Sequence, residues 1–300
     1  MKVAGMNAAT ERLMPVGGSM NLPLKNAKIE ASINEQGVLV PRVVPSMATG
    51  DWSDEDWGSA GPACIFQIGI CVATGKDGIG YPIKTANMGG TSVADLNNPA
   101  ANCAKLAAPP SWLTASPGKD VPTCPNDPRK LNFFPWNDTI HLHMTPVQFF
   151  DPLLNSWTLF VWGENSQLHK WGVSHRGMLT YIAQSHEFAS VDVRQGDPAH
   201  PFGGMPGGFC TGSSHGGDPD SAILVCTIPY GDANKEVTNG RLIVYDPVHL
   251  APDGSLKLLW DSQRWGIPFL FNKFDPPVID GGLIYVPNYD GGIDVFRLTP

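Results

Sequence analysis

The amino-acid sequence predicts an all-β protein. The chain of 300 residues contains 33 Gly and 28 Pro, which together make about a fifth of it, and both residues destabilise the interior of helices. The longest stretch free of both, residues 178–195, includes the β-favouring residues Thr180, Tyr181 and Ile182. This composition excludes a helical bundle, a coiled coil or an α/β barrel, while a hydrophobic content of 42% provides enough apolar surface for a folded core.

A loose unit of sequence recurs four times and supplies the strands. Each unit begins with Pro and small or apolar residues, passes through a variable loop into a β-rich run, and continues through a polar, Gly-containing turn into a second run. The units start at Pro62, Pro146, Pro206 and Pro277. The paired runs are 70–74 with 79–81, 159–162 with 167–171, 223–226 with 240–246, and 283–286 with 293–296. Because Asp-Gly and Gly-Gly supply the positive φ of tight hairpins, each unit predicts at least two antiparallel strands.

Four small sheets of this kind predict a β-propeller. A sheet of three or four strands cannot cover both of its faces alone, and stacking such sheets around an axis covers them. We therefore expect blades near residues 62–84, 141–182, 206–261 and 276–298. The N-terminal segment 1–50 holds part of a further blade, and a Pro-rich insertion at 85–140 interrupts the blade region 51–300. A β-sandwich is the alternative, because strands with turns at short intervals fit that fold as well.

Charge and hydropathy exclude two classes of partner. The net charge is −8, and no Lys/Arg cluster is longer than the pair Arg129-Lys130, so the chain lacks the positive surface that nucleic acid requires. No apolar run approaches 18 residues, so the sequence predicts no membrane span. Residues 1–7 contain no apolar core of a signal peptide. The protein is therefore either cytosolic or the product of a longer gene whose leader precedes this sequence.

The six cysteines favour the second alternative. An even number of cysteines in a loop-rich chain is typical of disulfides, and sequential pairing is the simplest of the fifteen possible arrangements. Cys210 and Cys226 lie in runs that read as neighbouring strands, and Cys103 and Cys124 bracket a Pro-rich loop. Disulfides would indicate a periplasmic or extracellular protein. In a cytosolic protein the same residues would be buried free thiols.

Several segments of the chain resemble one protein family. The longest is 272–287, Asn-Lys-Phe-Asp-Pro-Pro-Val-Ile-Asp-Gly-Gly-Leu-Ile-Tyr-Val-Pro, followed by Gly-Ile-Asp-Val-Phe at 292–296. Shorter segments that agree with it are 56–62, 161–165, 205–208 and 239–246. From Asp51 to Pro300 the chain is similar to the quinoprotein-like β-propellers, which carry pyrroloquinoline-quinone-type repeats. The resemblance implies a propeller, of which this chain is a C-terminal portion or a shortened relative.

The same resemblance bears on the cofactor. In dehydrogenases of this family, an adjacent pair of cysteines and a set of Asn, Asp and Glu side chains hold pyrroloquinoline quinone together with Ca²⁺. This sequence has no adjacent cysteines and no such set, and the tryptophan-docking pattern of the family is absent around Trp171 and Trp260. The resemblance therefore implies the fold more strongly than the cofactor.

His141-Leu142-His143 is the sharpest candidate for chemistry. Alternate residues of a strand project to the same face, so two imidazoles placed in this way can share a metal ion. A third ligand would come from His200, His215 or Glu164, and Glu164 with Asn165 reads as a hairpin turn. The alternative is that these histidines are polar residues that line a channel or cap a loop.

Two functions follow from these patterns. The first is a non-catalytic binding or assembly module outside the cytoplasm, which binds a protein or carbohydrate partner. Another chain or the segment 1–50 would complete the propeller. Trp52 and Trp57 offer a surface for a sugar or peptide. The second is a quinone-dependent dehydrogenase that oxidises alcohols or sugars, with Ca²⁺ holding the cofactor and His141 or Glu164 near it. Serine hydrolase chemistry is excluded, because no GxSxG elbow occurs.

Overall fold

The computed structural model describes residues 27–33, 39–45, 61–75, 80–85, 141–193 and 203–297, and it confirms an all-β protein. The described strands form five antiparallel sheets. The first two sheets are β1 (Ala27–Ile33) with β2 (Leu39–Pro45), and β3 (Ala63–Ile65), β4 (Ile70–Ala73) and β5 (Tyr81–Lys84). The third sheet contains β6 (Val147–Asp151), β7 (Ser156–Trp162), β8 (Gln167–Val173) and β9 (Leu179–Phe188).

The fourth and fifth sheets come from the C-terminal part of the chain. The fourth contains β10 (Phe209–Ser213), β11 (Ile223–Pro229), β12 (Asn239–Leu250), β13 (Leu256–Asp261) and β14 (Phe269–Leu270). The fifth contains β15 (Val278–Asp280), β16 (Leu283–Pro287) and β17 (Ile293–Arg297). Helical turns η3 (Pro219–Ser221) and η4 (Ser262–Trp265) lie in the loops. Each of the last four sheets thus falls within one of the four recurring sequence units.

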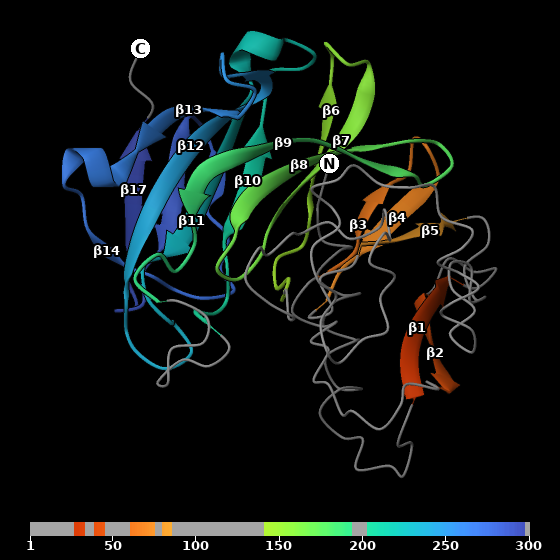
Figure 1. Cartoon of the computed structure of the whole chain (residues 1–300), viewed down its shortest axis with the longest axis horizontal. Helices are drawn as coiled ribbons and strands as arrows, with labels where there is room; N and C mark the ends of the chain where they lie inside the picture. Colours follow the sequence, from red (N-terminus) through yellow and green to blue (C-terminus); the bar gives the residue numbers. More distant parts are fainter. Residues whose placement is uncertain are drawn as a thin grey trace.

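The last four sheets pack face to face in chain order, as Figure 1 shows from orange through green to blue. Strand β7 illustrates why the core has separate layers. Its residues Leu159 and Val161 pack with the β3–β5 sheet, whereas Phe160 and Trp162 pack with the β10–β14 sheet. Successive residues of a strand point to opposite faces of its sheet. A run of apolar residues without alternation therefore contributes side chains to the core layers on both faces. A third layer lies between the β10–β14 and β15–β17 sheets and includes Val225 and Ile284.

The strand expected to carry His141 and His143 begins later than predicted. Residues 141–146 are not part of a strand, and β6 starts at Val147. Pro146 has no N–H to donate to a neighbouring strand, and other polar groups of residues 141–146 bond to other segments of the chain. The Leu142 N–H donates to the Gly75 carbonyl, and Met144 Sδ accepts from the Trp162 N–H. The two histidines therefore lie on an extended loop anchored to neighbouring segments.

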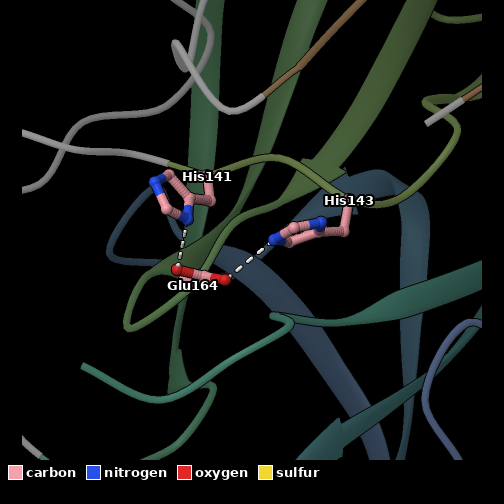
Figure 2. A group of neighbouring side chains, drawn as sticks. All are labelled: His141, His143 and Glu164. Carbon is pink, nitrogen blue, oxygen red and sulfur yellow. Dashed lines mark hydrogen bonds and ion pairs between the residues drawn. The ribbon is translucent and has the colours of Figure 1, made fainter. Parts of the chain in front are cut away.

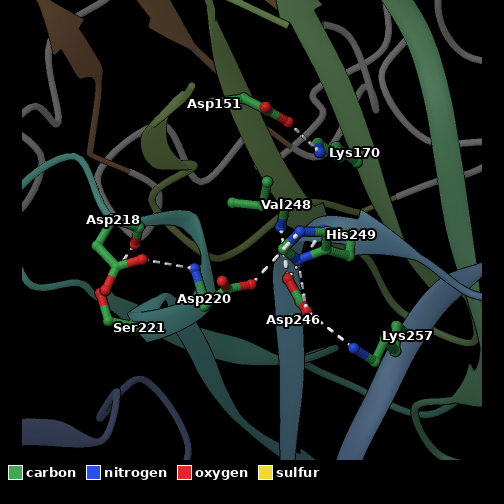
Figure 3. A network of polar contacts seen from close by, with 9 residues as sticks. All are labelled: Asp151, Lys170, Asp218, Asp220, Ser221, Asp246, Val248, His249 and Lys257. Carbon is green, nitrogen blue, oxygen red and sulfur yellow. Dashed lines mark hydrogen bonds and ion pairs between the residues drawn. The ribbon is translucent and has the colours of Figure 1, made fainter. Parts of the chain in front are cut away.

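Carboxylates organise the turns of the third and fourth sheets (Figure 3). Asp151, at the end of β6, accepts hydrogen bonds from the N–H groups of Leu153 and Leu154. Its other oxygen accepts from Lys170 Nζ at 2.6 Å, and both side chains of this ion pair are buried. Asp246 in β12 plays a similar part, because it is buried and accepts from two backbone N–H groups and from Nζ of the more exposed Lys257 at 3.3 Å.

Two disulfides join neighbouring strands. Cys64–Cys71 links β3 to β4, and Cys210–Cys226 links β10 to β11 at positions that pair directly in the sheet. The second is the pair that the sequence singled out. Cys103 and Cys124 lie outside the described residues, as does most of the 85–140 insertion. No helix in the described ranges is long and apolar enough to cross a membrane.

The ion pair of Asp261 with Arg241 predicts how the fold responds to acid. Arg241 donates two hydrogen bonds to Asp261, at 2.9 and 2.6 Å. Burial raises the pKa of Asp261, but the bonds from Arg241 and from the Gln263 N–H outweigh it and hold the pKa below its ordinary value of 3.8. A carboxylate with a depressed folded-state pKa stabilises the fold above its unfolded pKa, and this contribution is lost as pH falls through the folded pKa.

We therefore expect Asp261→Asn to be less stable than the wild type at pH 7 and to lose less further stability below about pH 4. Urea denaturation at pH 7, 5, 4, 3 and 2 measures the difference. Asp220→Asn is the control, because the Asp220 side chain is 86% exposed. A parallel loss of stability in Asp261→Asn and the wild type across the acid range would contradict the expectation.

Candidate metal centre

His141, His143 and Glu164 meet at one point of the structure (Figure 2). The Nδ1 atom of His141 lies 3.0 Å from Oε2 of Glu164, and Nε2 of His143 lies 2.8 Å from Oε1. The two histidines come from the loop before β6, and the glutamate comes from the turn between β7 and β8. Of the three residues considered as a third ligand, the structure brings Glu164 to the histidines. His215 lies exposed in the β10–β11 loop, and His200 lies outside the described residues.

The turn that carries Glu164 is held on several sides. The Glu164 N–H donates to the His141 carbonyl at 3.1 Å, which ties the turn to the histidine loop. Asn165 has a positive φ of 43°, a conformation that Asn tolerates better than most residues. Its side-chain amide donates to the carbonyls of Ser190 and Val193, and its oxygen accepts from the Gly204 N–H. The sequence predicted the turn, but not that Asn165 joins it to two distant loops.

The histidine loop is fixed by the core beneath it. Leu142 is fully buried among residues of the layer between the β3–β5 and β6–β9 sheets, and His141 and His143 flank it in the chain. His143 is fully buried, whereas His141 keeps a fifth of its side chain exposed. The cluster therefore meets solvent on the side of His141.

Phe274 forms an aromatic wall beside the cluster. The centre of its ring lies 5.9 Å from that of His143 and 5.8 Å from that of Phe209, edge to face in both cases. Its φ of 70° is rare for a bulky residue, and a hydrogen bond between Asn272 and Asp275 closes the turn around it. No signal in the sequence marks Phe274 as part of the site, because the loop that carries it follows the fourth sheet.

The electrostatics of the site keep Glu164 ionised. Burial raises the pKa of this carboxyl group, but hydrogen bonds and charge interactions with His141 and His143 lower it by more, so that the pKa lies below its ordinary value. Glu164 is thus an acceptor for both imidazoles within a mostly buried pocket of side chains. An ionised carboxylate that is already flanked by two imidazoles needs no proton removed before it binds a cation.

The donor atoms suit a transition metal ion. Each of the three residues offers one ligand atom, and these atoms lie within 4.8 Å of one another, the one such group of three among the described residues. Two His nitrogens and a carboxylate oxygen make the ligand set of many catalytic zinc sites, in which water takes the fourth position. Ca²⁺ instead takes six to eight oxygen ligands, which this cluster does not supply.

Of the remaining sequence candidates, Cys210 and Cys226 are not part of this group of ligand atoms. They are buried in the core between the third and fourth sheets and are joined in a disulfide. Trp52 and Trp57 lie outside the described residues. Comparison of the chain with protein-family models, curated proteins and solved structures finds no match.

Proposed function

We propose that this protein is a metal-binding module that acts outside the cytoplasm, and that His141, His143 and Glu164 hold a divalent transition metal ion of the zinc class. The observation that carries this proposal is the convergence of both imidazoles on the two oxygens of one ionised carboxylate. A metal ion would replace the two hydrogen bonds with coordination bonds, and the protons on Nδ1 of His141 and Nε2 of His143 would move to the other ring nitrogens or to solvent. His141 keeps a fifth of its side chain exposed, so a water or a small ligand would reach the ion from that side.

We propose further that the last four sheets are blades of a β-propeller, and the quinoprotein-like kind rests on the resemblance of the sequence. The first strands of consecutive sheets are neighbours, since β3 contacts β6, β6 contacts β10 and β10 contacts β15. Such a series of first strands is what blades around a common axis would produce. The histidine loop precedes one of these first strands, which would place the metal at the end of the propeller axis. Two disulfides support an oxidising compartment.

The quinone-dependent dehydrogenase remains the second candidate, supported by the family resemblance. The chemistry of the cluster favours it less, because Ca²⁺ prefers oxygen to imidazole nitrogen. Reconstitution with pyrroloquinoline quinone and Ca²⁺, followed by dye reduction with alcohols and aldose sugars, tests this candidate directly. Dye reduction that depends on the quinone would favour it over the zinc-class site.

Glu164→Gln tests the metal site. The amide keeps the shape of the side chain but loses the negative charge, so we expect Zn²⁺ affinity to fall by at least about 100-fold, more than the loss typical of an outer-shell residue. Calorimetric titration of chelator-treated protein with Zn²⁺, and separately with Ca²⁺, measures the affinities. The wild type should bind one Zn²⁺ far more tightly than Ca²⁺.

His186→Gln is the matched control. His186 also contacts a carboxylate, Asp253, at 2.7 Å, but both side chains are exposed and no second histidine joins them within the described part of the chain. This variant should bind Zn²⁺ as the wild type does. Near-ultraviolet circular dichroism establishes that each variant keeps its tertiary packing. A wild type that binds no Zn²⁺, or equal affinity in the wild type and Glu164→Gln, would refute the site.

A further inference from the structure

The outer face of the last sheet is apolar and exposed. Strands β15, β16 and β17 bury one face against the β10–β14 sheet through residues such as Ile284 and Val286. On the other face Val278, Ile293 and Val295 are exposed by 53%, 64% and 55%. The opposite end of the stack differs, because all four residues of the central strand β4 are buried. The stack of described sheets thus ends in a face with exposed apolar side chains.

The strand register orders this face into rows that run across the three strands. One row contains Val278, Tyr285 and Val295, which pair in sequence from β15 to β17. The next row contains Asp280, Leu283 and Arg297. Asp280 and Arg297 are both exposed, and they lie on opposite edges of the sheet. The face therefore has an apolar centre, a negative charge at its β15 edge and a positive charge at its β17 edge.

These rows match a second copy of the same face. A two-fold axis parallel to β16 places β15 of one copy opposite β17 of the other and keeps each residue at its level along the strand. Asp280 of each copy then faces Arg297 of the other, and Val278 faces Val295. The apolar row meets its own copy across the roughly 10 Å that separates packed sheets. Such an isologous contact contains two Asp280–Arg297 pairs, one on each side of the two-fold axis.

We propose that two copies of this chain associate through the outer face of the β15–β17 sheet. Its strands have three, five and five residues, so the flat contact covers on the order of 250 Å². This area is well below the roughly 800 Å² per partner of a standard interface, so we expect a weak dimer that forms only at high protein concentration. The proposal does not depend on the metal site, which lies on other elements.

A charge swap within the full chain tests the dimer. Arg297→Asp places Asp280 of one copy opposite a second aspartate, and we expect the dissociation constant to rise at least about 10-fold. Combining it with Asp280→Arg restores two pairs of opposite charge and should return the dissociation constant to near the wild-type value. Sedimentation equilibrium between about 10 and 500 µM, at low and at physiological salt, measures all three proteins.

Lys235→Asp controls for the change in net charge, because Lys235 is exposed in the β11–β12 loop and is not a residue of the β15–β17 sheet. It should dimerise as the wild type does. Val295→Lys should abolish association by placing a charge in the apolar row. The proposal is overturned if the wild type stays monomeric throughout the range, if Arg297→Asp associates as strongly as the wild type, or if the double swap stays as weak as Arg297→Asp.

Discussion

Replacing Lys170 by methionine is expected to destabilise the protein by about 3–5 kcal/mol, the cost typical of removing one partner of a buried ion pair. Lys170 Nζ is 2.6 Å from Asp151 Oδ2, and the side chains are 1% and 0% exposed. Methionine fills most of the lysine volume, so the expected loss comes from the carboxylate that stays buried without its cation. Urea denaturation at pH 7 measures the free energy of unfolding.

Two further variants separate this effect from the loss of packing. Lys257→Met removes the cation beside Asp246, but Lys257 is 47% exposed and its ammonium lies 3.3 Å from the carboxylate, so we expect a loss of at most about 1 kcal/mol. Lys170→Met combined with Asp151→Asn removes both charges and should recover a large part of the stability lost in the single variant. Equal destabilisation by Lys170→Met and Lys257→Met would contradict a buried, strongly coupled pair.

Removing the Cys210–Cys226 disulfide is expected to cost about 3 kcal/mol. The bridge spans a sequence separation of 16, and the chain-entropy model assigns a value of this size to a loop of that length. Both cysteines lie in the core layer between the third and fourth sheets, so Cys210→Ala with Cys226→Ala also leaves a small unfilled space. Denaturation of the oxidised wild type and the double variant measures the loss.

The shorter bridge supplies the comparison. Cys64 and Cys71 are only seven residues apart, so their double alanine variant should lose less stability than the Cys210/Cys226 variant. Peptide mapping without reduction, on protein made in an oxidising compartment, identifies each bridge directly. Recovery of Cys210 and Cys226 as alkylated free thiols would contradict the pairing and remove the main support for a location outside the cytoplasm.

Local patterns in the sequence were sufficient to predict the strands and several turns. The run 223–226 lies in β11, the run 240–246 lies in β12, and the turn at 163–166 joins β7 to β8. These elements depend on residues close together in the chain, namely β-favouring apolar runs and the Gly or Asn residues that turns require. The same local reasoning placed His141 and His143 on a strand, which was wrong because polar groups of that segment bond to Gly75 and Trp162, in other parts of the chain.

The candidate site was predicted only in part. The spacing of His141 and His143 identified two candidate ligands, but three residues were equal candidates for the third, since sequence spacing does not determine which turn meets which loop. The wall formed by Phe274 lies 110 residues after Glu164 and had no signal at all. The pairing of Lys170 with Asp151 was equally hidden, because a lysine within a strand reads as a solvent-facing residue until both faces of the sheet are covered.

The sequence by itself determined the all-β class, the four groups of strands and two of the three candidate metal ligands, His141 and His143. Backbone conformation and side-chain chemistry carry this information, and both are properties of short stretches of chain. Only the tertiary structure decided that Glu164 completes the cluster, that Lys170 is buried, and that the last sheet keeps an exposed apolar face. These features depend on which surfaces come into contact. The close packing of whole sheets determines those contacts, and residues far apart in the sequence contribute to it together.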